Sequence, residues 1–110
     1  QSIQRLLQNA ETYIRLENYE DAQKVYQKIT ELHPEDYKGW WGRIVADTRE
    51  FNIDDYSHLY EWNQWMIYVK KLANTMEYTQ LASQYGCFIR IISKAQAKDE
   101  IDKIIREIED

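Results

Sequence analysis

The feature that most constrains the fold is an alternation of small and aromatic residues in the first third of the chain. It comprises Ala10, Tyr13, Tyr19, Ala22 and Tyr26. Alanines at this spacing let two helix backbones cross closely, and tyrosines fill the space around the crossing. Pro34 then ends the second helix, because proline cannot continue the hydrogen-bond ladder. The pattern predicts a helical hairpin built to stack on further hairpins.

Apolar residues recur at three- and four-residue steps along the rest of the chain, which predicts helices rather than strands. The expected helices cover 2–16, 19–32, 37–48, from 54 or 55 to 73, a stretch beginning at 75, and 98–109. Asp54 or Asp55 and Thr75 are the expected caps of the fourth and fifth helices. With one Pro and three Gly among 110 residues, long helices with short links are favoured. We expect one domain over residues 1–110.

Charge and composition exclude several classes of partner. Fourteen basic residues against nineteen acidic ones give a net charge of −5, which argues against nucleic acid and against anionic membranes. No apolar run approaches the length that spans a bilayer. The single cysteine, Cys87, cannot form an internal disulfide, which fits a reducing, cytoplasmic location. The chain begins at Gln1 without a methionine, and we expect it to be a piece of a longer protein.

The stretch from Leu6 to Pro34 resembles a tetratricopeptide repeat (TPR), and the resemblance covers about residues 3–36. The matching positions are Leu6, Ala10, Tyr13, Tyr19, Ala22, Tyr26 and Pro34, whereas Asn9 and Ile29 depart from the family pattern. Thirty-four residues after Leu6, Trp40 falls on the equivalent position, but Ile44 and Asp47 depart. The block from Gly39 to Gly42 is similar to repeat regions of bacterial proteins. The resemblance implies an all-α, right-handed superhelix of about six antiparallel-packed helices.

In TPR domains the first helix of each hairpin lines a concave groove that takes a peptide or a partner helix. Carried over position by position, this groove would be lined by Leu7, Glu11, Ile14, Arg15, Lys38, Trp41, Val45 and Arg49. Leu7 and Glu11 replace the Lys and Asn of the family's clamp for a carboxy-terminal carboxylate, so that ligand is disfavoured. The resemblance implies a protein or peptide partner, and an apolar peptide with some acidic residues would suit the mixed lining.

Residues for catalysis or metal binding are sparse. His33, His58 and Cys87 are isolated in the sequence, so we expect no metal, no cofactor and no nucleophile–base pair. Cys87 is expected to be a buried, small apolar residue, and Gly86 to mark close packing against a neighbouring helix. The chain is therefore interpreted as a non-catalytic interaction module.

Two alternatives remain open for the role of the chain. One is a structural, self-associating domain that pairs as a homodimer through the isoleucine edge near the C-terminus or through the open end of the helix stack. The other is an enzyme or an accessory domain of a larger protein. Of the tryptophans, Trp40 is expected in the core, and one of Trp62 and Trp65 is expected to pack there.

Overall fold

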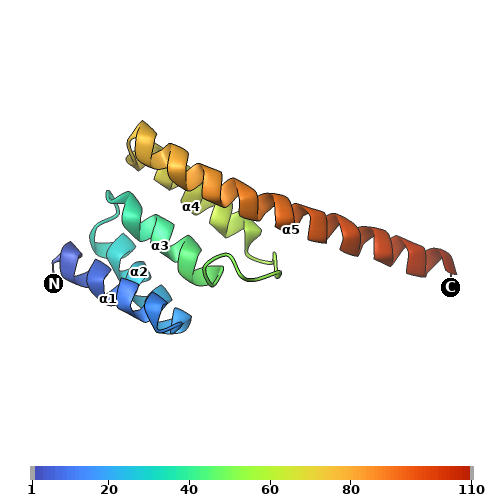
Figure 1. Cartoon of the computed structure of the whole chain (residues 1–110), viewed down its shortest axis with the longest axis horizontal. Helices are drawn as coiled ribbons and strands as arrows, with labels where there is room; N and C mark the ends of the chain where they lie inside the picture. Colours follow the sequence, from blue (N-terminus) through green and yellow to red (C-terminus); the bar gives the residue numbers. More distant parts are fainter. Residues whose placement is uncertain (1, 110) are drawn as a thin grey trace.

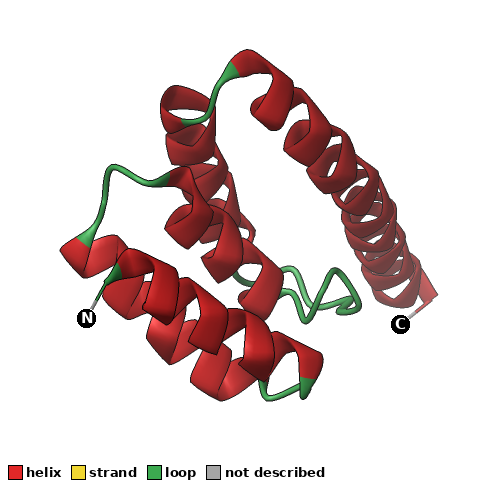
Figure 2. Ribbon diagram, turned by 60° about the vertical axis from the view of Figure 1, so that its left-hand side comes forward, coloured by secondary structure: helices red, strands yellow, loops and turns green. Residues whose placement is uncertain are grey.

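The computed structural model describes residues 2–109, which fold into helices joined by short loops, with no strand in that range (Figures 1 and 2). The helices are α1 (Ile3–Arg15), α2 (Tyr19–Leu32), α3 (Tyr37–Asp47), α4 (Leu59–Leu72) and α5 (Thr75–Glu109). The all-α prediction is confirmed, but the number of helices is five rather than about six. The molecule is elongated, with extents of 58 × 30 × 21 Å, because α5 projects beyond the other helices (Figure 1).

The first four helices pack in chain order, and α1 also contacts α3. Ala10 and Ala22 are completely buried where α1 crosses α2, as the alternation of small and aromatic residues predicts. Polar side chains cap the starts of α1, α2 and α3. Ser2 accepts a hydrogen bond from the Arg5 backbone N–H, and Asn18 accepts one from that of Asp21. Asp36 caps α3 in the same way, through the N–H of Lys38.

Two glycines, three residues apart, let α3 approach α2. A Cβ placed on Gly39 would lie 2.8 Å from Ile29 Cγ2, and one placed on Gly42 would lie 2.0 Å from the Tyr26 ring. Both glycines occupy the face of α3 that meets α2, since residues three apart share one side of a helix. The aromatic ring of Tyr26 therefore occupies the space that any side chain at position 42 would need.

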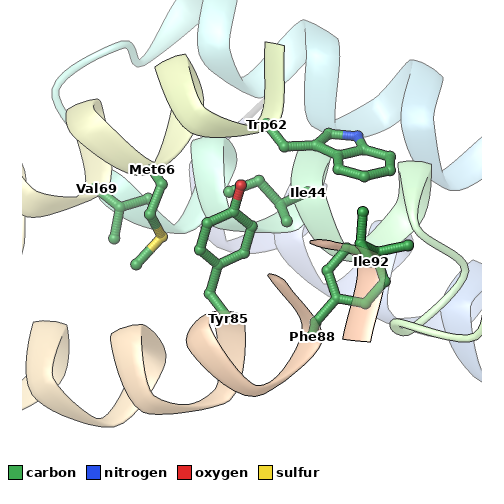
Figure 3. Close-up of a cluster of buried hydrophobic side chains, with 7 residues drawn as sticks. All are labelled: Ile44, Trp62, Met66, Val69, Tyr85, Phe88 and Ile92. Carbon is green, nitrogen blue, oxygen red and sulfur yellow. The ribbon is translucent and has the colours of Figure 1, made fainter. Parts of the chain in front are cut away.

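Helix α3 lies between two hydrophobic clusters. The first is formed by α1, α2 and α3 and comprises Leu6, Ala10, Ala22, Tyr26, Ile29 and Ala46. The second is formed by α3, α4 and α5 and comprises Ile44, Trp62, Met66, Val69, Tyr85, Phe88 and Ile92 (Figure 3). Trp62 is the tryptophan that packs in the core, as expected for one of the pair, while Trp65 is half-buried. Because α5 meets α4 through these large side chains, their backbones stay further apart than those of α1 and α2.

The last two expected helices are one continuous helix, α5, of 35 residues. No proline or glycine lies between Phe88 and Lys98, so nothing in the sequence stops the helix there. Asn74, rather than Thr75, caps α5. Its side chain accepts from the Glu77 N–H at 2.8 Å, and the Glu77 carboxylate accepts from the Asn74 N–H at 3.1 Å, which is a reciprocal capping box.

Two expectations for α5 are wrong. A Cβ on Gly86 would meet no atom of another helix, since the only neighbour within 4 Å is Arg90 Nη1, at 3.9 Å. Gly86 therefore does not mark close packing within the chain. Cys87 is exposed rather than buried, and its sulfur accepts a hydrogen bond from Arg90 at 3.2 Å.

The loop between α3 and α4 is longer than the sequence predicts, because α4 begins at Leu59 and not near residue 55. Asp55 accepts a hydrogen bond from the Ser57 N–H at 2.9 Å instead of capping the helix. Three consecutive residues, Arg49, Glu50 and Phe51, have positive φ, although none is glycine. The loop is held by Phe51, whose ring lies between those of Trp41 and Phe88, at centroid distances of 5.7 and 5.2 Å.

Candidate functional site

A hollow of about 410 Å³ lies between α1 and α3, and we call it the α1/α3 groove. It is lined by Leu7, Glu11, Ile14, Arg15, Tyr26, Lys38, Trp41, Gly42 and Val45. Seven of the eight residues expected from the TPR resemblance are thus brought together on one surface. Four come from α1 and three from α3, because residues spaced by three and four share a helix face.

Arg49 is the exception and does not line the α1/α3 groove. It follows the end of α3 with a φ of 51° and lines a different hollow, which it shares with Asp47 and His58. The expectation carried position 49 over from the TPR pattern, although it lies one residue past the predicted helix 37–48. The helix ends at Asp47, and the left-handed residue turns the chain away from α1. Position 49 therefore cannot be assigned by helical spacing.

Tyr26 and Gly42 belong to the groove and were missed by the sequence reasoning. Tyr26 is buried and comes from α2, but its ring reaches the groove beneath α3 because Gly42 has no side chain. Burial, with a smaller effect from Glu11, raises the pKa of Tyr26 to about 12. The phenol is therefore neutral at neutral pH. The available signal was a glycine on the predicted α2-facing side of the third helix.

The groove has an apolar interior and a charged edge. Leu7, Ile14 and Val45 are half-buried, and so is Trp41, which is braced from behind by Phe51. The charged groups on the rim are exposed: Glu11, Arg15 and Lys38. Two cations and one anion give the groove a small positive excess in a chain that is acidic overall. The arrangement suits apolar side chains flanked by carboxylates, and it brings together no nucleophile and base.

Asp47, on the opposite face of α3, has more side-chain hydrogen-bond partners than any other carboxylate within residues 2–109. It accepts from Gln23 Nε2 of α2 at 2.8 Å and from the indole N–H of Trp62 of α4 at 2.6 Å. Nδ1 of His58, at the N-cap of α4, lies 2.9 Å from it. The Asp47 side chain is only 15% exposed. It therefore links three helices, at a position where the TPR pattern has a tyrosine.

Arg43 lies beside this cluster and stacks on two tryptophans. Its guanidinium carbon is 4.4 Å from the centre of the Trp65 ring and 5.7 Å from that of Trp40. Burial lowers its pKa, but a guanidinium stays charged at any ordinary pH. Trp40, expected in the core, is half-buried and packs against the second cluster without being a buried member of it. Its indole N–H donates to the Pro34 carbonyl at 2.9 Å and its ring meets Tyr68 edge-on.

The remaining candidates for chemistry do not converge. Nδ1 of His33 lies 3.7 Å from Glu35, and the sulfur of Cys87 contacts Arg90 rather than a histidine. Within residues 2–109 no three metal-ligating side chains form a group that could hold an ion. No helix in this range has both the length and the apolar character needed to cross a membrane.

The His58–Asp47 pair makes the free energy of unfolding depend on pH. The hydrogen bond to Asp47 and its negative charge raise the pKa of His58 above 6.5. Folding is therefore favoured by this pair below pH about 6.5, and the contribution is lost as pH rises through the higher folded pKa. Since the His58 side chain is 59% exposed, we expect a loss below about 1 kcal/mol. Urea unfolding between pH about 6 and 8 measures it, and His58→Gln should remove this component of the slope.

No protein-family model, curated protein or solved structure matched the chain. The candidate site is therefore defined by the geometry of the α1/α3 groove and by the sequence resemblance alone.

Proposed function

We propose that the chain is a non-catalytic interaction module that binds a peptide or a partner helix in the α1/α3 groove. We further propose that α1–α4 form two TPR-like hairpins, the first regular and the second divergent. The observation that carries the proposal is the convergence of seven expected residues, from two helices whose first residues are 34 positions apart, on one hollow of about 410 Å³. Sequential packing of α1 to α4, with α1 also touching α3, supports the hairpin stack.

The lining of the groove favours one kind of ligand. Trp41 offers a large flat face that its partner Phe51 holds in place, and such aromatic anchors are enriched in binding hot spots. Arg15 and Lys38 are the charged side chains at the two walls that would meet acidic residues, whereas Glu11 disfavours a carboxylate deep in the groove. We therefore propose a ligand with at least two apolar side chains flanked by Asp or Glu, in extended or helical form.

The expected result is that Trp41→Ala weakens ligand binding by at least tenfold, or about 1.4 kcal/mol, because it removes the anchor. Lys38→Glu should weaken binding of the same peptide about threefold to tenfold, and the defect should shrink at high salt. A random peptide library displayed on phage and selected on the immobilised chain provides the ligand. Fluorescence anisotropy of the selected peptide measures the affinity for each variant.

Arg49→Glu is the matched control for Lys38→Glu, because each variant reverses one basic charge. Lys38 lies in the first turn of α3, and Arg49 lies two residues past its C-terminal end. Only position 38 lines the groove. The selected peptide should bind Arg49→Glu and the native chain equally well. If it binds Trp41→Ala and Lys38→Glu as tightly as the native chain, the proposed groove is not the binding site.

A further inference from the structure

The two halves of the outer face of α5 differ in the size of their side chains. The C-terminal half presents exposed isoleucines, of which Ile101, Ile104 and Ile108 are 56, 54 and 77% exposed. At about 100° per residue, they lie on the side of the helix opposite Phe88 and Ile92, which face the core. The same side of the N-terminal half carries three small residues, Thr79, Ser83 and Gly86, followed by Arg90. One stripe of α5 thus has large apolar side chains in its C-terminal half and mostly small residues in its N-terminal half.

We propose that this stripe is the interface of a homodimer in which two copies of α5 pair antiparallel. One register sets each small residue opposite a large one of the partner copy. The facing positions are 79 with 108, 83 with 104, 86 with 101, and 90 with 97. In each pair the two numbers have the same sum, which is what a single antiparallel register requires. Gly86 lies at the edge of a hollow that it shares with α4, and an added Cβ there would meet no atom of another helix of its own chain. It receives the Ile101 side chain of the second copy.

The shape of the molecule permits this pairing. The rest of each chain packs on the core-facing side of α5, and the opposite side is free along the helix in both views (Figures 1 and 2). The two bodies would therefore lie on opposite sides of the helix pair. At 1.5 Å per residue, the stretch from Thr79 to Ile108 provides about 45 Å of paired helix. A second copy fits better than an unrelated helix because this chain carries both the large isoleucines and the small residues that would accommodate them.

The pairing should be weak and sensitive to salt. About ten residues per copy would take part, roughly half of the 20–30 found in a standard interface, so the dimer is expected to form at micromolar concentrations. Near the two-fold axis, Lys94 meets Lys94 of the other copy. The net charge of −5 on each chain adds to this repulsion. Higher ionic strength should therefore strengthen the dimer.

Light scattering and sedimentation across a hundredfold range of concentration test the proposal. The average mass should rise from 13.4 kDa toward about twice that value. Gly86→Leu should keep the chain monomeric over the whole range, and its Cβ would meet only Arg90 Nη1 of its own chain, at 3.9 Å. Thermal unfolding of the same sample shows that the variant folds. Ile91→Lys is the matched control, because Ile91 is 68% exposed on α5 but lies off the stripe, and it should dimerise like the native chain.

A size exchange tests the register. Ile101→Ala should weaken the dimer about tenfold, and G86L/I101A should dimerise more tightly than G86L, because the larger residue now faces the smaller one. In a Cys87→Ser background, mixing an Arg90→Cys chain with an Ala97→Cys chain should give a disulfide-linked dimer under oxidation. Ala97→Cys alone should not cross-link to itself. Self-linking of position 97 would show parallel pairing and overturn the proposed register.

A native chain that stays monomeric at every concentration would overturn the proposal as a whole, as would a G86L variant that dimerises normally. Failure here leaves the proposed function intact, because the α1/α3 groove and the outer face of α5 share no residue. Trp41→Ala should accordingly leave the concentration dependence of the mass unchanged.

Discussion

Replacing Gly42 by alanine is expected to lower the free energy of unfolding by about 2–3 kcal/mol, as a small-to-large change in a packed core. The added Cβ would lie 2.0 Å from one Tyr26 ring carbon and 2.1 Å from another. Tyr26 is buried and packs in the first cluster, so its ring cannot move aside without disturbing α1 and α2. The gain in helix propensity from glycine to alanine, about 1 kcal/mol, offsets only part of the strain. Urea denaturation of both proteins measures the difference.

The same substitution at Gly86 is the matched control, with the opposite sign. A Cβ there would make only an ordinary van der Waals contact, with Arg90 Nη1 at 3.9 Å, so Gly86→Ala should raise the free energy of unfolding by up to about 1 kcal/mol through helix propensity. Measurements at concentrations where the chain is monomeric separate this effect from any self-association. A Gly42→Ala protein as stable as the native chain would show that Tyr26 does not occupy the space beside α3.

The clash between an added Cβ at position 42 and the Tyr26 ring also predicts that the effects of mutations at these two positions on stability are not additive. Tyr26→Leu on its own should destabilise the chain, because a large buried side chain is lost. In this background Gly42→Ala should be far less harmful, since the ring that it meets is gone. The double-mutant cycle should give an interaction energy of about 1–3 kcal/mol. Additive effects would show that the Tyr26 ring is not the source of the strain.

The first hairpin could be predicted from the sequence because its signals are local. Ala10, Ala22 and Pro34 each act on a neighbouring helix or on the next residue in the chain, and the structure places all of them as expected. The groove residues come from the TPR resemblance, and seven of the eight lie on facing sides of α1 and α3. Where helical geometry holds, spacing determines which side chains meet.

The errors lie where geometry departs from the helix or where a break was expected without a breaking residue. Arg49, Glu50 and Phe51 adopt positive φ without a glycine, so nothing in the sequence signals that the chain turns there. Each left-handed residue costs about 1–2 kcal/mol, which the packing of Phe51 between two aromatic rings helps to offset. The prediction that Gly86 marks a contact between helices is wrong, because the only atom near an added Cβ there is Arg90 Nη1, at 3.9 Å.

The Asp47 cluster could not have been found from the sequence, because its members come from three helices without common spacing. Its importance to the fold can be measured. Asp47→Ala is expected to lower the free energy of unfolding by about 3 kcal/mol, since it removes hydrogen bonds to a charged acceptor and leaves the buried Trp62 indole N–H without its partner. Asp47→Asn keeps one carbonyl acceptor and the side-chain volume, and should cost about half as much.

Two further variants decide whether Asp47 acts by holding the helices together. Gln23→Ala and His58→Ala each remove one donor and leave the Trp62 bond in place, so each should cost no more than about 1 kcal/mol. Trp62 is 1% exposed, and its indole N–H is the donor that water cannot satisfy after Asp47 is lost. In a Trp62→Phe background that N–H is absent, and Asp47→Ala should then cost markedly less than in the native chain. An undiminished cost in that background would mean that Asp47 stabilises the fold through its other two partners.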